Sequence, residues 1–332
     1  MRKMKLNYKE DWPLYLIILG VTVAIINEST NAIHNTGNKI VIEEKKEEWQ
    51  QPSLYVDNEL KGAERAQVIY GEELIANTAH YFGPHGVLQQ ITNGMNCQNC
   101  HLQAGAKAWG NNYDAVFTTY PRFRDRSGTV ETIATRINDC FERSLNGQAI
   151  DTSSKEMQAM VAYIKWLGHT VKKGQKPEGA GITQLPYLTR AANPQKGAVV
   201  YMAKCSACHG ANGEGVADEH GYGFIYPPLW GVHSYNSGAG LFRLSRFAGY
   251  IKDNMPFNQA SHQSPALTDE EAWDVAAFVN TQPRPVKDIS HDWPDISKKP
   301  VDHPFGPFAD GFSEKQHKYG PFQPIDSVRK AK

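Results

Sequence analysis

The sequence Cys97-Gln98-Asn99-Cys100-His101 places two thiols and an imidazole at the spacing of a covalent haem attachment site. In such a site the cysteines form thioethers with the porphyrin and the histidine binds the iron. The pattern recurs at Cys205-Ser206-Ala207-Cys208-His209. A zinc site would need a second pair of Cys or His ligands at a defined spacing for each motif, and the sequence offers none. The two motifs therefore predict two covalently bound haem c groups.

The length and composition are those of a globular protein with two domains plus extensions. The chain has 332 residues and a formal net charge of +0, so its total charge indicates neither nucleic acid nor a strongly charged partner. Four of its five cysteines belong to the two motifs. The fifth, Cys140, is left over and needs an explanation of its own.

Residues 1–28 have the pattern of an export segment. Basic residues near the start precede an apolar run over residues 14–26, which is shorter than the ~20 residues that a membrane-spanning helix needs. We expect either a cleaved signal peptide or an uncleaved N-terminal anchor, followed by a linker over residues 29–60. Both alternatives put the body of the protein in the periplasm.

The two motifs lie at corresponding places in an internal repeat. In each unit an amphipathic helix precedes the motif, and a loop-rich stretch and a closing helix follow it. The four helices are expected at residues 63–81, 154–167, from 193 into Cys205, and from 268 to just before Pro283. Ser153 with Glu156, and Thr268 with Glu271, form capping boxes at the starts of the closing helices. We predict an all-α fold of two cytochrome c-like domains, residues 61–171 and 193–283, joined by a linker over 172–192.

Residues 284–332 form a C-terminal extension rich in proline, glycine and aromatic residues, as in Pro304-Phe305-Gly306-Pro307-Phe308. Such a composition disfavours regular helix. The aromatic side chains predict that the extension packs along the domains.

Each haem iron needs a second axial ligand or an open position. For the second haem we predict Met255, because a methionine followed by proline in a loop before the closing helix is the usual place of this ligand in small cytochromes c. Met202 is expected in a helix, as part of the core. The weaker alternatives are Lys252, His220 and His233.

For the first haem the sequence has no such Met-Pro loop before the linker. Residues 130–147 instead predict a helix that carries Cys140, with Arg136 one turn before it on the same face. A thiolate at this place can bind iron. A small buried apolar side chain is the alternative.

Arginines surround this helix in the sequence: Arg122, Arg124, Arg126, Arg136 and Arg143. The planar guanidinium group suits doubly charged oxyanions such as sulfonates. A solvated basic surface is the alternative, above all for Arg122 and Arg143. Arg136 favours the first interpretation because it shares the face of Cys140.

Several segments resemble the dihaem thiosulfate dehydrogenases: the two haem motifs, residues 126–132, residues 136–147, and Asp292-Trp293-Pro294-Asp295 followed by Lys299-Pro300. The resemblance covers nearly the whole chain after the export segment. It implies His/Cys ligation of the first haem by His101 and Cys140, and an active site there that includes Arg126 and Arg136. Some relatives have a lysine ligand next to the methionine of the second haem, where this chain has Asn254.

The resemblance also implies a reaction: two thiosulfates are oxidised to tetrathionate at the first haem, or tetrathionate is reduced in reverse. We assign Arg126 and Arg136 to the sulfonate oxygens, because two dianions must approach each other. Cys140 is expected to form a covalent adduct with the first thiosulfate, which the second thiosulfate then attacks. Electrons would leave through the second haem, with His209 and Met255 as iron ligands, to a periplasmic carrier such as a cytochrome.

Three other functions fit part of the pattern. A dihaem electron carrier without a substrate site explains the motifs but neither Cys140 nor the arginines. A dihaem peroxidase would need a displaceable ligand and a distal acid–base group. Persulfidation of Cys140 in a thiosulfate-carrier pathway would need a protein-bound sulfur acceptor.

Overall fold

The computed structural model describes residues 34–36, 39–41, 51–52 and 60–331. The predicted export segment lies outside the described residues, as does most of the predicted linker after it. The chain divides into two compact units, residues 1–47 and 48–332. In the first, strand β1 (His34–Thr36) pairs antiparallel with β2 (Lys39–Val41). All further elements belong to the second unit, so the predicted boundaries at residues 171 and 193 remain predictions.

The first half of the larger unit is built on two crossing helices, α2 (Gly62–Ala76) and α7 (Lys155–Leu167). They approach closely at Gly71, where a Cβ would collide with the carbonyl oxygen of Ala159. Between them lie α3 (Thr78–Phe82), the 3-10 helix η1 (Cys97–Asn99), α4 (Leu102–Gly105), α5 (Val116–Thr119), strands β3 (Arg122–Arg124) and β4 (Thr129–Glu131), and α6 (Ile133–Arg143).

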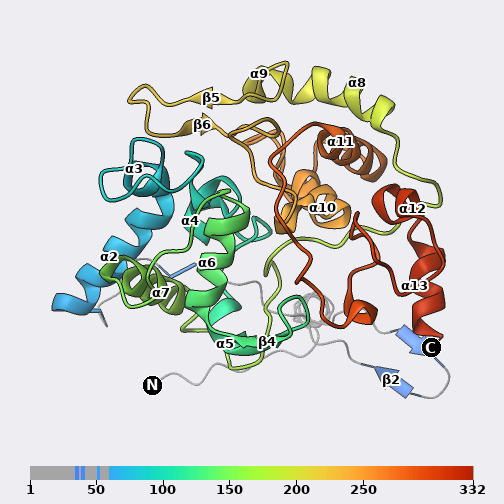
Figure 1. Cartoon of the computed structure of the whole chain (residues 1–332). Helices are drawn as coiled ribbons and strands as arrows, with labels where there is room; N and C mark the ends of the chain where they lie inside the picture. The colour runs from blue at the N-terminus through green and yellow to red at the C-terminus, as the bar shows by residue number, and fades with distance from the viewer. Residues whose placement is uncertain (1–33, 37–38, 42–50, 53–59, 332) are drawn as a thin grey trace, which may run out of the picture. The chain divides into compact units, whose positions relative to one another are not determined.

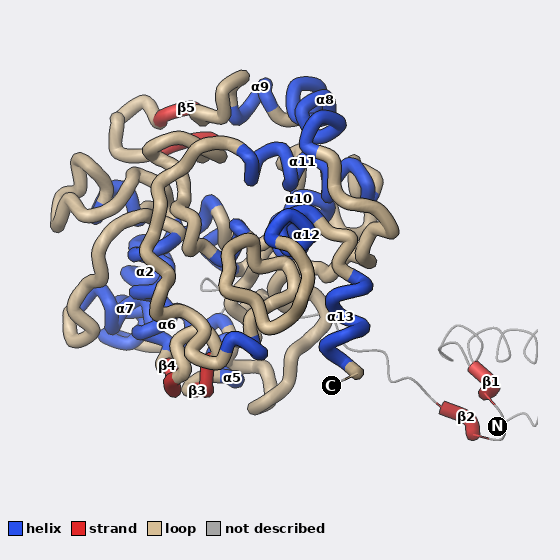
Figure 2. The backbone as a smooth tube through the Cα atoms, turned by 45° about the vertical axis from the view of Figure 1, so that its right-hand side comes forward, coloured by secondary structure: helices blue, strands red, loops and turns tan. Residues whose placement is uncertain are grey.

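The second half repeats this crossing with α8 (Pro194–Lys204) and α11 (Asp269–Thr281). A Cβ at Gly197 would collide with the carbonyl oxygen of Asp274, as at the first crossing. Between these helices lie α9 (Ser206–His209), β5 (Val216–Ala217), β6 (Phe224–Tyr226), η2 (Gly240–Phe242) and α10 (Leu244–Asn254). Figures 1 and 2 show α2, α6 and α7 on one side of this unit and α8, α10 and α11 on the other.

Two hydrophobic cores follow the two halves. One joins α2, α6 and α7 through side chains such as Leu74, Phe141 and Met160. The other joins α8, α10 and α11 and includes Trp273. The described residues are mostly helical, and their strands are two to three residues long and pair only in two-stranded ribbons. This confirms the predicted fold class. Among the residues that the structure describes, no helix is long and apolar enough to cross a membrane.

Most predicted helices are present, with corrected ends. The predicted helix over residues 63–81 is two helices, which break at Asn77. Helix α7 is capped by Ser154, whose hydroxyl accepts from the Met157 amide, and the predicted box from Ser153 is absent. The box of Thr268 and Glu271 is present at α11.

Helix α6 is shorter than the predicted stretch of residues 130–147. It begins after Thr132, whose hydroxyl accepts from the Thr135 amide, and ends at Arg143. Val130, predicted on its apolar face, is 66% exposed and belongs to β4. Residues 130 and 131, which the apolar pattern assigned to the helix, therefore belong to the β3–β4 ribbon.

The C-terminal extension packs against the second core, as predicted, through the buried Phe322 and Ile325. The prediction that it lacks regular helix was wrong. It contains the 3-10 helix η3 (Ile296–Lys298) and two α-helices, α12 (Glu314–Tyr319) and α13 (Gln323–Lys330). Ser313 caps α12, and a proline in the first turn of α13, where no amide donor is needed, suits a helix start.

Candidate functional site

The first motif lies on η1 and the turn after it, and residues 83–96 separate it from α3. His101 is half-buried, and its Nδ1 lies 2.5 Å from the carbonyl oxygen of Asn111. A carbonyl only accepts, so Nδ1 carries the proton and Nε2 is left as the iron ligand. Burial lowers the pKa of His101 to about 4, which keeps the imidazole neutral. The motif thus presents a histidine that is ready to bind a metal.

A cavity of about 170 Å³ opens between this motif and α6. His101 and both motif cysteines line it, together with Arg136 and Cys140 of α6. Apolar side chains such as Met160 and Ile164 fill much of the remaining wall. The structure therefore brings together the residues that the sequence predicted around the first haem, with one exception.

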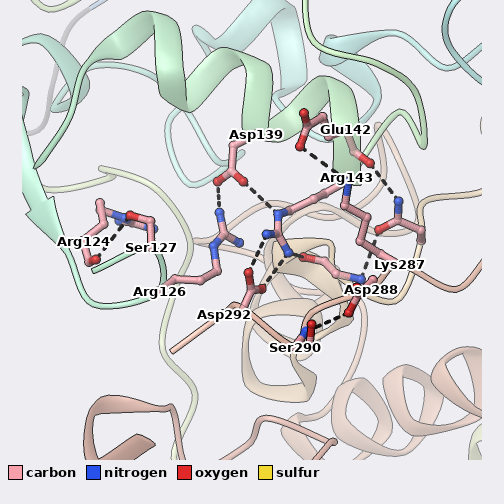
Figure 3. Close-up of polar contacts among 12 residues, drawn as sticks. Arg124, Arg126, Ser127, Asp139, Glu142, Arg143, Lys287, Asp288, Ser290 and Asp292 are labelled. Carbon is pink, nitrogen blue, oxygen red and sulfur yellow. Dashed lines mark hydrogen bonds and ion pairs between the residues drawn. The ribbon is translucent and has the colours of Figure 1, made fainter. Parts of the chain in front are cut away.

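The exception is Arg126, which does not line this cavity. Its guanidinium pairs with the carboxylate of Asp139 on α6, and its side chain is 12% exposed. Figure 3 shows it beside Arg143, with Asp139 between the two. Burial is the main reason that the pKa of Arg126 is lowered to about 9, and the neighbouring guanidinium of Arg136 adds to this effect.

Asp139 joins three arginines in one cluster. Besides Arg126 it binds Nη1 of Arg136 at 2.8 Å and Nε of Arg143 at 2.8 Å. The spacing of three and four residues puts Arg136, Asp139 and Arg143 on neighbouring turns of α6. Sequence reasoning missed Asp139, although its place three residues after Arg136 was a usable signal. Asp139 holds the arginine that faces Cys140.

The C-terminal extension closes this cluster from outside. Asp292 accepts from both Nη atoms of Arg143 at 2.7 Å, which Figure 3 shows as a two-pronged contact. The amide of Trp293 also donates to the carbonyl oxygen of Arg126 at 2.7 Å. The segment around Asp292 was noted in the sequence but had no predicted role. It fixes the helix end and the ribbon that carry the arginines.

Charge links Arg136 to Cys140, one turn further along α6. The proximity of Cys140 is the largest cause that raises the pKa of Arg136, and burial opposes it. A guanidinium at this place stabilises a thiolate and can also hold an oxyanion. Burial raises the pKa of Cys97 and Cys100 to about 12, so these two thiols stay protonated unless they are bonded.

The second motif lies at the end of α8 and on α9. His209 Nδ1 lies 2.9 Å from the carbonyl oxygen of Pro227, which again leaves Nε2 as the ligand atom. Both motif cysteines, His209 and Met255 line a cavity of about 900 Å³. This volume lies in the range of cofactor sites. Met255 follows α10 directly and lines the same cavity as the motif.

The alternatives to Met255 fit this cavity less well. Met202 is 55% exposed on α8, so its predicted core position was wrong. Lys252 is bound to the carbonyl oxygen of Leu267 and to Asp269. His220 touches the cavity but is 73% exposed at its side chain and paired with Glu219. His233 is exposed and does not line the cavity.

The two cavities adjoin. Both are lined by Asn96 and Cys100 of the first half. Tyr250 on α10 donates to the carbonyl oxygen of Asn99, inside the first motif, at 3.0 Å. Groups bound at the two motifs would therefore lie close together.

The residues at both motifs fit covalent haem. Each site has two unpaired cysteines, a histidine with a fixed tautomer, and a largely apolar wall. Each also has a sulfur ligand candidate that lines the same cavity, Cys140 in the first and Met255 in the second.

Comparison with known proteins agrees with this geometry. Residues 89–172 match the family described as SoxA/TsdA, cytochrome c domain, and residues 194–283 match the family described as cytochrome c. Each matched region contains one motif, so the chain carries two covalently bound haem c groups.

Similar proteins include a thiosulfate dehydrogenase from Allochromatium vinosum, 38% identical over 68% of this chain and 81% of that protein. One from Psychrobacter arcticus is 40% identical over 61% of each chain, so the match spans less than two thirds of that protein. Among solved structures, thiosulfate dehydrogenase (TsdBA) from Marichromatium purpuratum in its as-isolated form aligns with a TM-score of 0.64 and 32% identity. The alignment covers 72% of this chain and 50% of that one.

Proposed function

Because the chain belongs to the dihaem thiosulfate dehydrogenase family, we propose that it oxidises two thiosulfate ions to tetrathionate at its first haem site. The reverse reduction would use the same residues. The observation that carries the proposal is the single cavity that His101, Arg136 and Cys140 share. An electron carrier needs neither a thiol nor a guanidinium at this place.

Arg136 binds the sulfonate end of thiosulfate. Its side chain is 31% exposed, so the guanidinium keeps access to the cavity while Asp139 holds it. Two dianions repel each other strongly where water is excluded, and a fixed cation offsets this repulsion. Arg126 does not line the cavity but pairs with Asp139, which also binds Arg136. We therefore assign Arg126 a positioning role.

Cys140 supplies the sulfur that links the two half-reactions. Its thiolate and the sulfane sulfur of the first thiosulfate form an S–S bond, which gives a cysteine S-thiosulfonate and releases two electrons. The bound haem groups supply the one-electron acceptors for this oxidation. The second thiosulfate attacks the sulfane sulfur of the adduct, tetrathionate leaves, and the Cys140 thiolate is restored. No proton is taken up or released in either step.

His101 and Met255 are proposed iron ligands at the first and the second haem site. We propose that His101 with Cys140 ligates the first iron, and that His209 with Met255 ligates the second. Thiolate ligation lowers a reduction potential and thioether ligation raises it. Haem groups held by these residues would therefore favour electron transfer from the first site to the adjoining second site, and from there to an external carrier such as a periplasmic cytochrome.

An exported chain suits this chemistry, because covalent haem attachment and the basic, apolar start of the sequence both indicate the periplasm. The N-terminal segment is either removed or kept as an anchor.

The test is turnover of the purified holoprotein with thiosulfate and ferricyanide. We expect one tetrathionate for every two ferricyanide ions reduced, and no turnover with hydrogen peroxide and a reduced cytochrome. If the protein forms no tetrathionate although dithionite still reduces its haem groups, the proposal is refuted in favour of a plain electron carrier. Turnover of peroxide would favour a peroxidase.

A further inference from the structure

Residues 107–112, here termed the 107–112 loop, follow the first motif but reach into the second half of the molecule. Backbone bonds from the Trp109 amide to Gly179 O and from the Asn111 amide to Gly181 O, both 2.8 Å, tie the loop to the linker. Trp109 and Asn111 both have a φ of 61°, a left-handed conformation that non-glycine residues rarely adopt. The surrounding contacts hold the loop in this conformation.

One end of the loop supports the first site. The carbonyl oxygen of Asn111 accepts from His101 Nδ1, and the Asn111 side-chain amide donates to the carbonyl oxygen of Cys100 at 3.2 Å. Both contacts orient the first motif.

The other end of the loop holds the segment around Met255. Nδ2 of the fully buried Asn254 donates to the carbonyl oxygen of Trp109 at 3.0 Å. The Trp109 ring stacks on His262, with ring centroids 3.8 Å apart and an interplanar angle of 11°. Lys107 Nζ lies 5.6 Å from the ring centroid of Phe257. These contacts flank Met255 on both sides in the sequence.

The second half also holds this segment: Met255 packs on the second core, and its amide donates to the carbonyl oxygen of Ile251 at 2.9 Å. Asn254 Nδ2 also reaches Tyr250 O at 2.9 Å, one turn back on its own helix. His262 Nδ1 lies 3.1 Å from Asp253. Asn254 and His262, which lie on either side of Met255 in the sequence, are thus held by contacts to both halves, and the contacts from the first half come from the carbonyl oxygen and the ring of Trp109.

We propose that Trp109 is a positioning residue that keeps Met255 in place as the ligand of the second haem. The proposal rests on the proposed function only in that Met255 is the ligand. It adds that the first half of the chain builds part of the second haem site, so ligation of the second haem depends on a loop that also supports the first.

The test compares Trp109→Ala, His262→Ala and the conservative Trp109→Phe in the full-length holoprotein. We expect both alanine variants to weaken the long-wavelength absorption band of Met-ligated ferric haem, to lower the potential of the second haem, and to increase binding of carbon monoxide to it by roughly threefold to tenfold. Trp109→Phe, which retains a stacking ring, should restore most of the band. The potential of the first haem should stay as in the wild type, because the Asn111 contacts remain.

An unchanged band and unchanged potential of the second haem in both alanine variants would overturn the proposal. So would a wild-type protein that lacks the methionine band. Because none of these readouts needs thiosulfate, a protein that shows the expected shifts but forms no tetrathionate would support the positioning role and refute only the proposed reaction.

Discussion

Arg136 and Cys140 lie one turn apart on α6, and both side chains line the cavity that His101 also lines. Helical spacing alone brings the cation and the thiol together. Asp139, between them in the sequence, binds the guanidinium groups of Arg126, Arg136 and Arg143. The helix thus separates a positioning carboxylate from the reacting sulfur.

Arg136→Ala should reduce kcat/KM for thiosulfate by roughly 10²-fold, because a fixed donor to a developing or approaching negative charge is lost. Arg136→Lys should recover part of this loss, since it keeps the charge without the planar fork. The measurement is steady-state tetrathionate formation. Arg122→Ala is the matched control, because Arg122 is an exposed arginine of β3 that does not line the cavity. Equal losses in Arg122→Ala and Arg136→Ala would contradict the assignment.

Asp292→Ala should lower the free energy of unfolding by about 2–4 kcal/mol. It leaves Arg143, whose side chain is 12% exposed, without its two-pronged partner. Guanidinium denaturation followed by circular dichroism measures this change. Asp295→Ala serves as the control, because Asp295 is exposed and caps only a 3-10 turn, so its loss should cost less than about 1 kcal/mol. If the two variants unfold alike, the extension does not stabilise the arginine cluster.

The buried Asp302 should make stability depend on pH. Burial by itself would raise its pKa, but the guanidinium of Arg243 and bonds from Ser245 outweigh burial and lower the pKa. A carboxyl group whose pKa is lower in the folded than in the unfolded protein stabilises the folded state at pH values above its ordinary pKa. This contribution disappears as the pH falls through the folded-state pKa. Melting temperatures of the wild type and Asp302→Asn should therefore differ most near neutral pH and converge below about pH 4. A difference that stays constant down to acid pH would show that Asp302 acts through packing.

Local patterns predicted much of this structure. The haem motifs, the Asn193 and Thr268 caps and the helical face shared by Arg136 and Cys140 all depend on residues within a few positions of one another. The bond between Arg143 and Asp292 joins residues 149 positions apart, so no local spacing could reveal it. The same holds for the contact between Trp109 and His262.

Where local patterns failed, tertiary contacts decided the structure. Val130 continued the apolar spacing of α6, yet the turn of the β3–β4 ribbon and the Thr132 cap start the helix later. Arg126 and Arg136 were predicted as equals at the sulfonate oxygens. The fold turns Arg126 to the far side of Asp139, because the extension holds the backbone of Arg126 through the Trp293 amide.

In the proposed reaction the Cys140 sulfur forms the covalent adduct, so tetrathionate formation by Cys140→Ala is the decisive measurement. The substitution removes only the sulfur from a half-buried side chain on α6, so both haem groups should still attach and be reducible. We expect the variant to keep its haem content and the methionine band of the second haem, and to lose tetrathionate formation by at least roughly 10³-fold, as for other catalytic nucleophiles. Full activity of Cys140→Ala, at wild-type haem content, would contradict the account.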